Sequence, residues 1–101
     1  MSARPTIFVS IAAYRDREAL PTIKDIFDKA AHPENIHVSI CWQYNSLRDE
    51  PFTISDRKSQ VSVINVDYKK ARGLGWARHL TQKLYGGETY YLQIDSHSRF
   101  I

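Results

Sequence analysis

The sequence predicts an α/β fold, with a Rossmann-like and mostly parallel sheet and two crossover helices. Four short runs rich in β-branched and aromatic residues alternate with two stretches of helical periodicity. The first run is apolar at successive positions, as expected for a strand that is buried on both faces. Alternating strands and helices favour parallel strands joined by right-handed crossovers, and we expect the strand order 3-2-1-4. A crevice then opens between the first and fourth strands, where the order reverses.

The first half of the chain contains one strand, one helix and a second strand. The strands are expected at residues 6–12 (TIFVSIA) and 36–42 (IHVSICW). Asp16 is suited to cap a helix over residues 17–31, which His32–Asn35 ends. Pro21 lacks a backbone donor, so a regular helix that begins near Pro21 is the alternative. The apolar stripe of this helix consists of Leu20, Ile23, Phe27, Ala30 and Ala31.

A long polar loop over residues 43–60 opens the second half, and loops of this length are functional or mobile. A third strand, a basic turn, a second helix and a fourth strand follow. They are expected at residues 61–66 (VSVINV), 69–73, 74–85 and 90–94 (YYLQI). Gly86-Gly87 ends the second helix, whose buried stripe is predicted to be Ala77, Leu80 and Leu84.

The composition indicates one soluble domain with a mild basic excess. The 101 residues carry 14 Lys and Arg against 11 Asp and Glu, a formal charge of +3. This excess favours anionic ligands such as nucleotide phosphates but is too small and scattered for a nucleic-acid-binding face. The single cysteine, Cys41, suits a reducing compartment and is expected to be a buried strand residue. Because the sequence shows neither a signal peptide nor a membrane-spanning run, we expect a cytoplasmic protein.

Asp95 and His97 directly follow the fourth strand, at the edge where ligands bind in an open α/β sheet. A carboxylate and an imidazole supply the oxygen and nitrogen ligands that suit Mn²⁺, and Mg²⁺ is the alternative. The remaining coordination positions would take diphosphate oxygens and water, and the metal would neutralise charge on a leaving diphosphate. The other interpretation is a polar turn that leaves the strand, where Asp and Ser are common. The remaining histidines, His32, His37 and His79, show no metal-ligand spacing and are expected to be structural or solvent-facing.

Glycines precede and open the second helix, in the segment ARGLGWAR (residues 71–78). Glycine permits close backbone approach and a helix N-terminus attracts anions, so Gly73 is a candidate for contact with a nucleotide phosphate. The segment is neither a P-loop nor a Rossmann fingerprint. Arg78 lies off the buried stripe and is a candidate to reach the crevice; a solvent-exposed helix arginine is an equal alternative.

The carboxyl ends of the first two strands supply further candidates for nucleotide binding. Tyr14 is placed to stack on uracil, with a core aromatic as the alternative, and Arg15 is placed to meet phosphate. Trp42 ends the second strand at the same edge and is expected to be a core residue. The full set of candidates at this edge is Ser10, Ala13, Tyr14, Arg15 and Gln43.

These motifs together resemble the GT-A fold of glycosyltransferases. The inverting family-two pattern, Asn-x-Gly…Ala-Arg-Asn before a strand and Asp-x-Asp, is similar to Ala71-Arg72-Gly73…Ala77-Arg78-His79 followed by LQIDSH. The form Asp95-Ser96-His97 is similar to the metal motif of mucin-type polypeptide GalNAc-transferases. Over most of the chain, the segments IFVSIAAYRD, ICWQ, ARGLGWAR and YYLQIDSHSRF resemble the UDP-GlcNAc:polypeptide (hydroxyproline) N-acetylglucosaminyltransferase family.

The resemblance implies metal-assisted transfer of N-acetylglucosamine from UDP-GlcNAc to a hydroxyl of a polypeptide or glycan acceptor. It implies that Asp95 and His97 bind the metal and that Arg78 and Tyr14 border the nucleotide. Residues 1–101 would then be the nucleotide-sugar-binding half of a GT-A domain, truncated or incomplete. The acceptor-binding half and the usual catalytic base would lie downstream, so the catalytic residue is unknown and the fragment alone is expected to be inactive.

Two other functions fit parts of the pattern. A non-catalytic binding or assembly module would use an exposed edge of the sheet and would form a homo-oligomer through it. A nucleotidyltransferase also places acids at strand ends, but such enzymes usually carry a glycine-rich loop after the first strand. The segment SIAAYRD contains no glycine, which counts against the nucleotidyltransferase.

Overall fold

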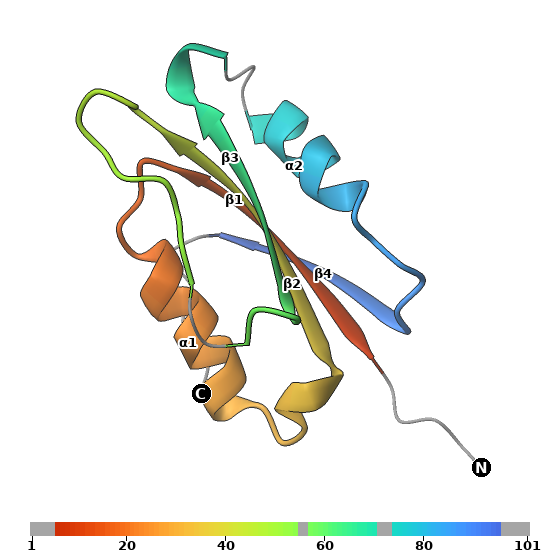
Figure 1. The fold of residues 1–101 in the computed structure, drawn as a ribbon. Helices are drawn as coiled ribbons and strands as arrows, with labels where there is room; N and C mark the ends of the chain where they lie inside the picture. Colours follow the sequence, from red (N-terminus) through yellow and green to blue (C-terminus); the bar gives the residue numbers. More distant parts are fainter. Residues whose placement is uncertain (1–5, 55–56, 71–73, 96–101) are drawn as a thin grey trace.

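The described residues form one sheet of four parallel strands in the predicted order, β3-β2-β1-β4, with a helix on each face (Figure 1). The computed structural model describes residues 6–54, 57–70 and 74–95. Neither helix within these ranges is long and apolar enough to cross a membrane. In chain order the elements, including two 3₁₀ turns (η), are β1 (Ile7–Tyr14), α1 (Ala19–Lys29), η1 (Pro33–Asn35), β2 (Ile36–Tyr44), β3 (Val61–Asp67), η2 (Tyr68–Lys70), α2 (Leu74–Gln82) and β4 (Tyr90–Asp95).

The strands run farther than the hydrophobic pattern predicts. β1 continues to Tyr14, β2 to Tyr44 and β3 to Asp67. Backbone pairing continues through these polar ends, because Tyr14 lies opposite Gln43 and Tyr44 lies opposite Asp67. Ladder hydrogen bonds satisfy the backbone of any residue except proline, so side-chain patterns understate the length of a paired strand.

Helix α1 begins at Ala19, later than the predicted start at Arg17. The predicted cap at Asp16 is wrong, because Glu18 is the N-cap residue and makes no capping side-chain hydrogen bond. Asp16 orders the preceding turn instead: its Oδ1 accepts the backbone N–H of Glu18 at 2.9 Å, and its carbonyl accepts that of Ala19 at 3.2 Å. Pro21 lies in the first turn of the helix, where backbone N–H groups have no intrahelical partner. The alternative start near Pro21 is therefore confirmed.

The main core lies between α1 and one face of the sheet (Figure 1). Trp42 and Phe52 close this core at the carboxyl ends of the strands, with ring centroids 5.5 Å apart. Trp42 is buried, which confirms its predicted core position. Its Nε1 donates a hydrogen bond to the carbonyl of Glu50 at 3.0 Å. The predicted helical stripe is wrong at Ala31, which lies beyond the helix and is exposed. The buried residues of α1 are Ala19, Thr22, Ile23, Ile26 and Phe27.

Helix α2 packs on the opposite face through small and polar side chains. Ala77 and Thr81 are fully buried, one helical turn apart on the same side of the helix. The predicted stripe is wrong at Leu84, because α2 ends at Gln82 and Leu84 beyond it is 39% exposed. Leu80 is half-buried. A close approach of helix and sheet therefore depends on Ala77 and Thr81.

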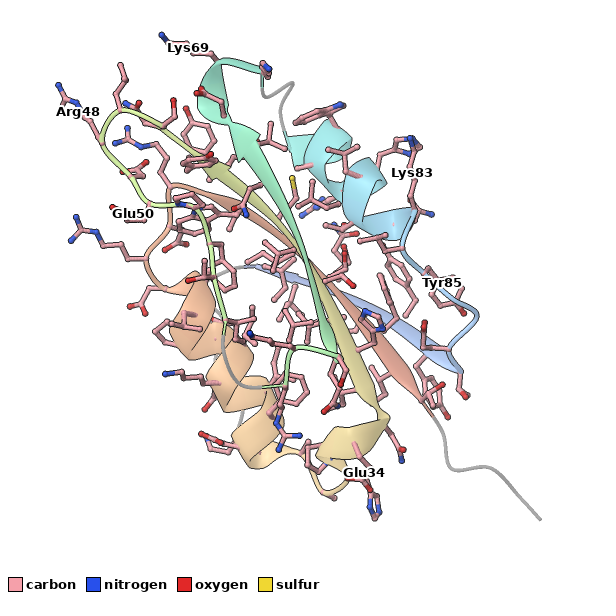
Figure 2. The ribbon with its side chains drawn as sticks, viewed as in Figure 1. Glu34, Arg48, Glu50, Lys69, Lys83 and Tyr85 are labelled. Carbon is pink, nitrogen blue, oxygen red and sulfur yellow. The ribbon has the colours of Figure 1, made fainter. Side chains whose placement is uncertain are left out.

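The prediction that Gly86-Gly87 ends the second helix is wrong, because α2 already ends at Gln82. Gly87 has a φ of 87°, a left-handed conformation that glycine adopts without steric cost. Just before these glycines, the ring of Tyr85 lies 5.5 Å from that of Phe8 and 5.6 Å from that of Tyr91, edge to face in both pairs. Tyr85 lies beyond α2, and its ring therefore joins this segment to β1 and β4 (Figure 2).

Candidate functional site

The carboxyl ends of β1 and β4 lie side by side where the strand order reverses (Figure 1). The register places Asp95, the last residue of β4, opposite Ala12. β1 extends past the end of β4 through Ala13 and Tyr14. Ligands bind outside this edge in open α/β sheets, and the predicted topology of the edge is confirmed.

Tyr14 presents its ring at the end of β1, whereas its neighbours Ala13 and Gln43 are buried. The side chain of Tyr14 is 56% exposed, so the alternative of a core aromatic is wrong. Ala13 is fully buried and Gln43 is 3% exposed. Gln43 Nε2 donates a hydrogen bond to the carbonyl of Ala13 at 3.3 Å, which uses the amide to join β2 to β1. Of these three candidates, Tyr14 is the one whose side chain is open to a ligand.

Arg15 is held by the β2–β3 loop. Its backbone N–H donates to the carbonyl of Gln43 at 2.7 Å, and its φ of 49° turns the chain away from the strand. Its Nε lies 2.7 Å from Oδ2 of Asp49, which also accepts the backbone N–H of Asn45 at 2.8 Å. The hydrogen bond from Arg15, followed by that from Asn45, lowers the pKa of the Asp49 carboxyl. The guanidinium predicted to meet phosphate thus has a carboxylate partner.

Ser10 lies inside the sheet, and its predicted position at the carboxyl end of β1 is wrong. It precedes the end of the strand at Tyr14 and is fully buried. Its hydroxyl is hydrogen-bonded to the hydroxyl of Thr81, which donates to the carbonyl of Arg78 at 2.9 Å. Ser10 faces α2, and its role in this structure is to join β1 to the helix.

The start of α2 lies on the side of the sheet opposite α1, near the end of β3 (Figure 1). Arg78 is half-buried and lies in the middle of this helix. Gly73 lies outside the described residues, so its predicted contact with phosphate stays a prediction. Because Arg78 has an intermediate exposure, both its nucleotide-binding role and its solvent-exposed alternative stay predictions.

Asp95 is placed by its backbone at the end of β4, whereas His97 lies outside the described residues. The described residues contain no group of three or more His, Cys, Asp and Glu side chains arranged to hold a metal ion. His37 packs against Phe8 with ring centroids 5.9 Å apart and lies within 2.9 Å of the hydroxyl of Ser62, so its predicted structural role is confirmed. The choice between a metal site and a polar turn at Asp95 stays open.

Family comparison covers most of the chain. A family model described as Glycosyltransferase (GlcNAc) matches residues 6–58 and residues 53–101. The chain belongs to this glycosyltransferase family. Comparisons with curated proteins and with solved structures found no match. In general terms, a glycosyltransferase takes a nucleotide-sugar donor and an acceptor.

The glycosyltransferase also has a hollow at the carboxyl edge that sequence reasoning did not identify. It has a volume of about 410 Å³ and lies on the α1 side of the edge. Three arginines, Arg15, Arg17 and Arg48, line it together with Trp42 and Phe52. The loop between β2 and β3 forms part of its wall, and the length of that loop is the one sequence signal that indicated a functional segment here.

Proposed function

We propose that this glycosyltransferase binds UDP-GlcNAc together with Mn²⁺ or Mg²⁺ at the carboxyl edge of β1 and β4. It then transfers N-acetylglucosamine to a hydroxyl of a polypeptide or glycan acceptor. The supporting observation is the register that sets Asp95 beside Ala12, with the exposed ring of Tyr14 farther along β1. The description of the family, which specifies GlcNAc, supports the choice of sugar.

The neighbours of Asp95 in the sheet are compatible with a divalent cation. The cross-strand row that contains Asp95 continues through Ala12 to Cys41. Ala12 is small, and burial raises the pKa of the Cys41 thiol to about 11, so neither neighbour brings a charge at neutral pH. Asp95 and His97 would supply the carboxylate oxygen and imidazole nitrogen that suit Mn²⁺. When bound there, the cation would neutralise charge that develops on the leaving diphosphate.

Two side chains of the chain itself are proposed to position the donor. Tyr14 shares a face of the sheet with Ser10, because alternate residues of a strand point to the same side. Ser10 contacts α2, so Tyr14 lies on the α2 side, where its exposed ring can stack on a uracil base. Arg78 belongs to the same helix and would offer its guanidinium to phosphate oxygens. Gly73 would let the backbone before α2 approach the same phosphates.

Titration calorimetry of UDP-GlcNAc in Mn²⁺ and in EDTA tests this function. We expect binding that requires the metal and that falls by at least about ten-fold in Asp95→Ala, because the carboxylate is a proposed ligand. Asp28→Ala removes an exposed carboxylate of α1 and serves as the matched control. Equal affinity in EDTA would contradict the metal site. An Asp95→Ala variant that is unfolded by circular dichroism would favour the polar-turn interpretation.

Self-association through β4 is a second candidate function, favoured by exposed apolar side chains on that strand. Tyr90 and Leu92 are 58% and 42% exposed. Leu92 also lines a hollow of about 220 Å³ together with Ile7 and Ile26. β4 is the last strand of the order within the described residues, and a strand with one open edge can pair with another copy. We therefore propose a homo-oligomer formed through β4.

A further inference from the structure

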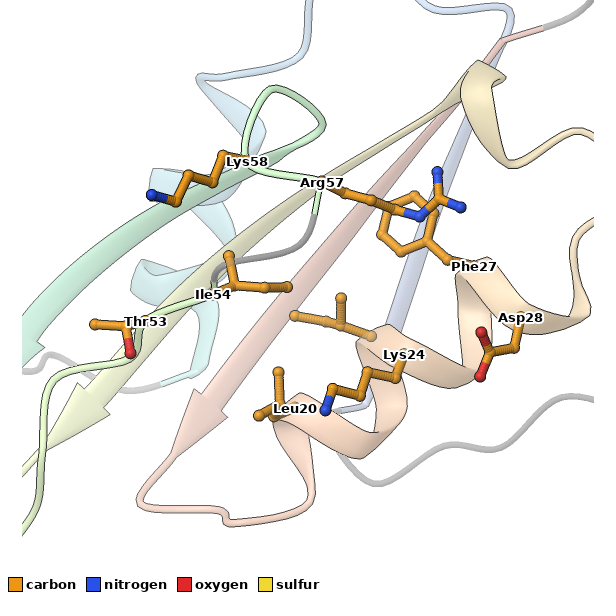
Figure 3. Close-up of a pocket in the computed structure, with 9 residues that line it drawn as sticks. Leu20, Lys24, Phe27, Asp28, Thr53, Ile54, Arg57 and Lys58 are labelled. Carbon is orange, nitrogen blue, oxygen red and sulfur yellow. The ribbon is translucent and has the colours of Figure 1, made fainter.

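A groove on the α1 side of the molecule lies away from Asp95 and takes no part in the proposed donor site. It has a volume of about 380 Å³ and lies between α1 and four residues of the β2–β3 loop, Thr53, Ile54, Arg57 and Lys58 (Figure 3). We call this feature the α1 groove. Leu20, Ile23 and Ile54 give it an apolar floor. Its volume is within the range of about 300–1,000 Å³ that is usual for ligand sites.

Positive charge surrounds this apolar floor. Lys24 extends from α1, and Arg57 and Lys58 extend from the loop on the opposite wall (Figure 3). Asp28 is the one carboxylate among the described lining residues, which together carry three positive charges against one negative charge. Basic groups on both walls can hold carboxylates on either side of an apolar side chain that fills the floor.

Arg57 is held in place over the groove. Its guanidinium carbon lies 4.8 Å from the centre of the Phe27 ring, and Nη1 donates to Oε1 of Gln60 at 3.2 Å. Its φ of 58° is a left-handed conformation that costs energy for an L-residue with a long side chain. Because Phe27 is 6% exposed and lies under Arg57, its ring is not open to stacking by a nucleic-acid base. The groove therefore fits a ligand that carries carboxylates and aliphatic side chains.

We propose that the α1 groove binds an acidic polypeptide segment in which an aliphatic side chain is flanked by Asp or Glu. The aliphatic side chain would lie on Leu20 and Ile54, and the flanking carboxylates would pair with Lys24 and Lys58. This interaction is separate from donor binding, since Asp95 lies at the end of β4, whereas the groove is built by α1 and the β2–β3 loop.

The test uses a short fluorescein-labelled peptide in which Leu alternates with Glu, and measures fluorescence anisotropy with the whole chain. The double variant Lys24→Glu/Lys58→Glu should bind at least about ten-fold more weakly, because both walls become repulsive. The matched control is Lys69→Glu/Lys83→Glu, which has the same net charge and changes lysines away from α1 (Figure 2). It should keep the wild-type affinity, and both double variants should keep the wild-type circular dichroism spectrum and calorimetric affinity for UDP-GlcNAc.

Three outcomes would overturn the proposal. The first is an equal loss of peptide binding in the two double variants, which would reflect net charge alone. The second is equal binding of a control peptide with Gln in place of Glu. The third is binding of the wild-type chain to vesicles of anionic phospholipid but not to the Leu–Glu peptide, which would assign the groove to a lipid surface. Absence of UDP-GlcNAc binding would contradict the proposed function and would leave the proposal for the groove unchanged.

Discussion

Arg15 and Asp49 form a salt bridge that joins the end of β1 to the β2–β3 loop, with Nε of Arg15 2.7 Å from Oδ2 of Asp49. The second carboxylate oxygen, Oδ1, lies 3.5 Å from Nη2. Oδ2 also accepts the backbone N–H of Asn45, so one carboxylate holds both the guanidinium and the start of the loop. The loop is thereby fastened at the same edge of the sheet as the proposed donor site.

Replacing Asp49 by Asn should loosen this loop without unfolding the sheet. The amide keeps an acceptor but loses the charge that strengthens the bond to Arg15. Amide hydrogen exchange of residues 45–49 should become severalfold faster, while exchange in β1 stays the same. Asp28→Asn, a change at an exposed carboxylate of α1, is the control and should alter neither. Unchanged exchange in Asp49→Asn would show that the salt bridge does not hold the loop.

The same salt bridge predicts a dependence of stability on pH. Because the hydrogen bond from Arg15 lowers the pKa of Asp49, the folded state favours the ionised carboxylate. Its contribution to the free energy of unfolding is fully present above the unfolded-state pKa of about 3.9. It is lost as the pH falls through the lower pKa of the folded state. The difference in unfolding free energy between wild type and Asp49→Asn should therefore shrink in acid.

The hydroxyls of Ser10 and Thr81 predict an asymmetric response to mutation. Thr81 gives its proton to the carbonyl of Arg78, so Ser10 must be the donor to Thr81. Thr81→Val leaves the buried Ser10 hydroxyl without its acceptor and should cost about 1–3 kcal/mol. Ser10→Ala removes a donor and leaves Thr81 bonded to Arg78, so it should cost about 0.5–1.5 kcal/mol.

Urea unfolding of the two single variants and of the double variant checks this order. The double variant should be no less stable than Thr81→Val, because the unpaired serine hydroxyl is then absent. A larger loss in Ser10→Ala than in Thr81→Val would reverse the assignment of donor and acceptor.

The thiol of Cys41 should be unreactive in the folded protein, and its ionisation should lower the stability of the fold at alkaline pH. It is fully buried, and burial raises the pKa of its thiol from 9.0 to about 11. Its contribution to stability is fully present below the unfolded pKa and is lost as the pH rises through the folded value. A disulfide reagent should modify the thiol slowly in buffer and fast in urea. The extra loss of unfolding free energy between pH 9 and 11 should be absent in Cys41→Ala; rapid modification of the folded protein would contradict the burial.

Leu92 is expected to control self-association. Sedimentation at micromolar concentration should show an oligomer for the wild type and a shift to monomer for Leu92→Glu, because a charge on β4 opposes pairing of sheet edges. Leu47→Glu is the matched control, since Leu47 is 83% exposed on the β2–β3 loop. A wild type that is monomeric at these concentrations would remove the assembly proposal.

Sequence alone determined the strand order and the main elements of this protein. Runs such as VSVINV show the local residue pattern of a strand. The rules for parallel crossovers then convert alternating strands and helices into the order 3-2-1-4. The position of Asp95 at the end of a strand followed from the same local pattern. The core position of Trp42 and the buried Cys41 were likewise readable, because apolar residues in a strand covered on both faces are buried.

Tertiary structure decided which side chains at the edge are open and which are occupied. Ser10 and Thr81 meet across 71 residues, and Arg15 and Asp49 across 34. Such partners depend on how the helix and the loop settle on the sheet, which no local period encodes. The same contacts bury Ser10, which the sequence had placed at the surface edge, and give Arg15 a carboxylate partner. Hydrophobic patterning thus determines the layers, whereas the pairing of polar groups is set only when distant segments are brought together.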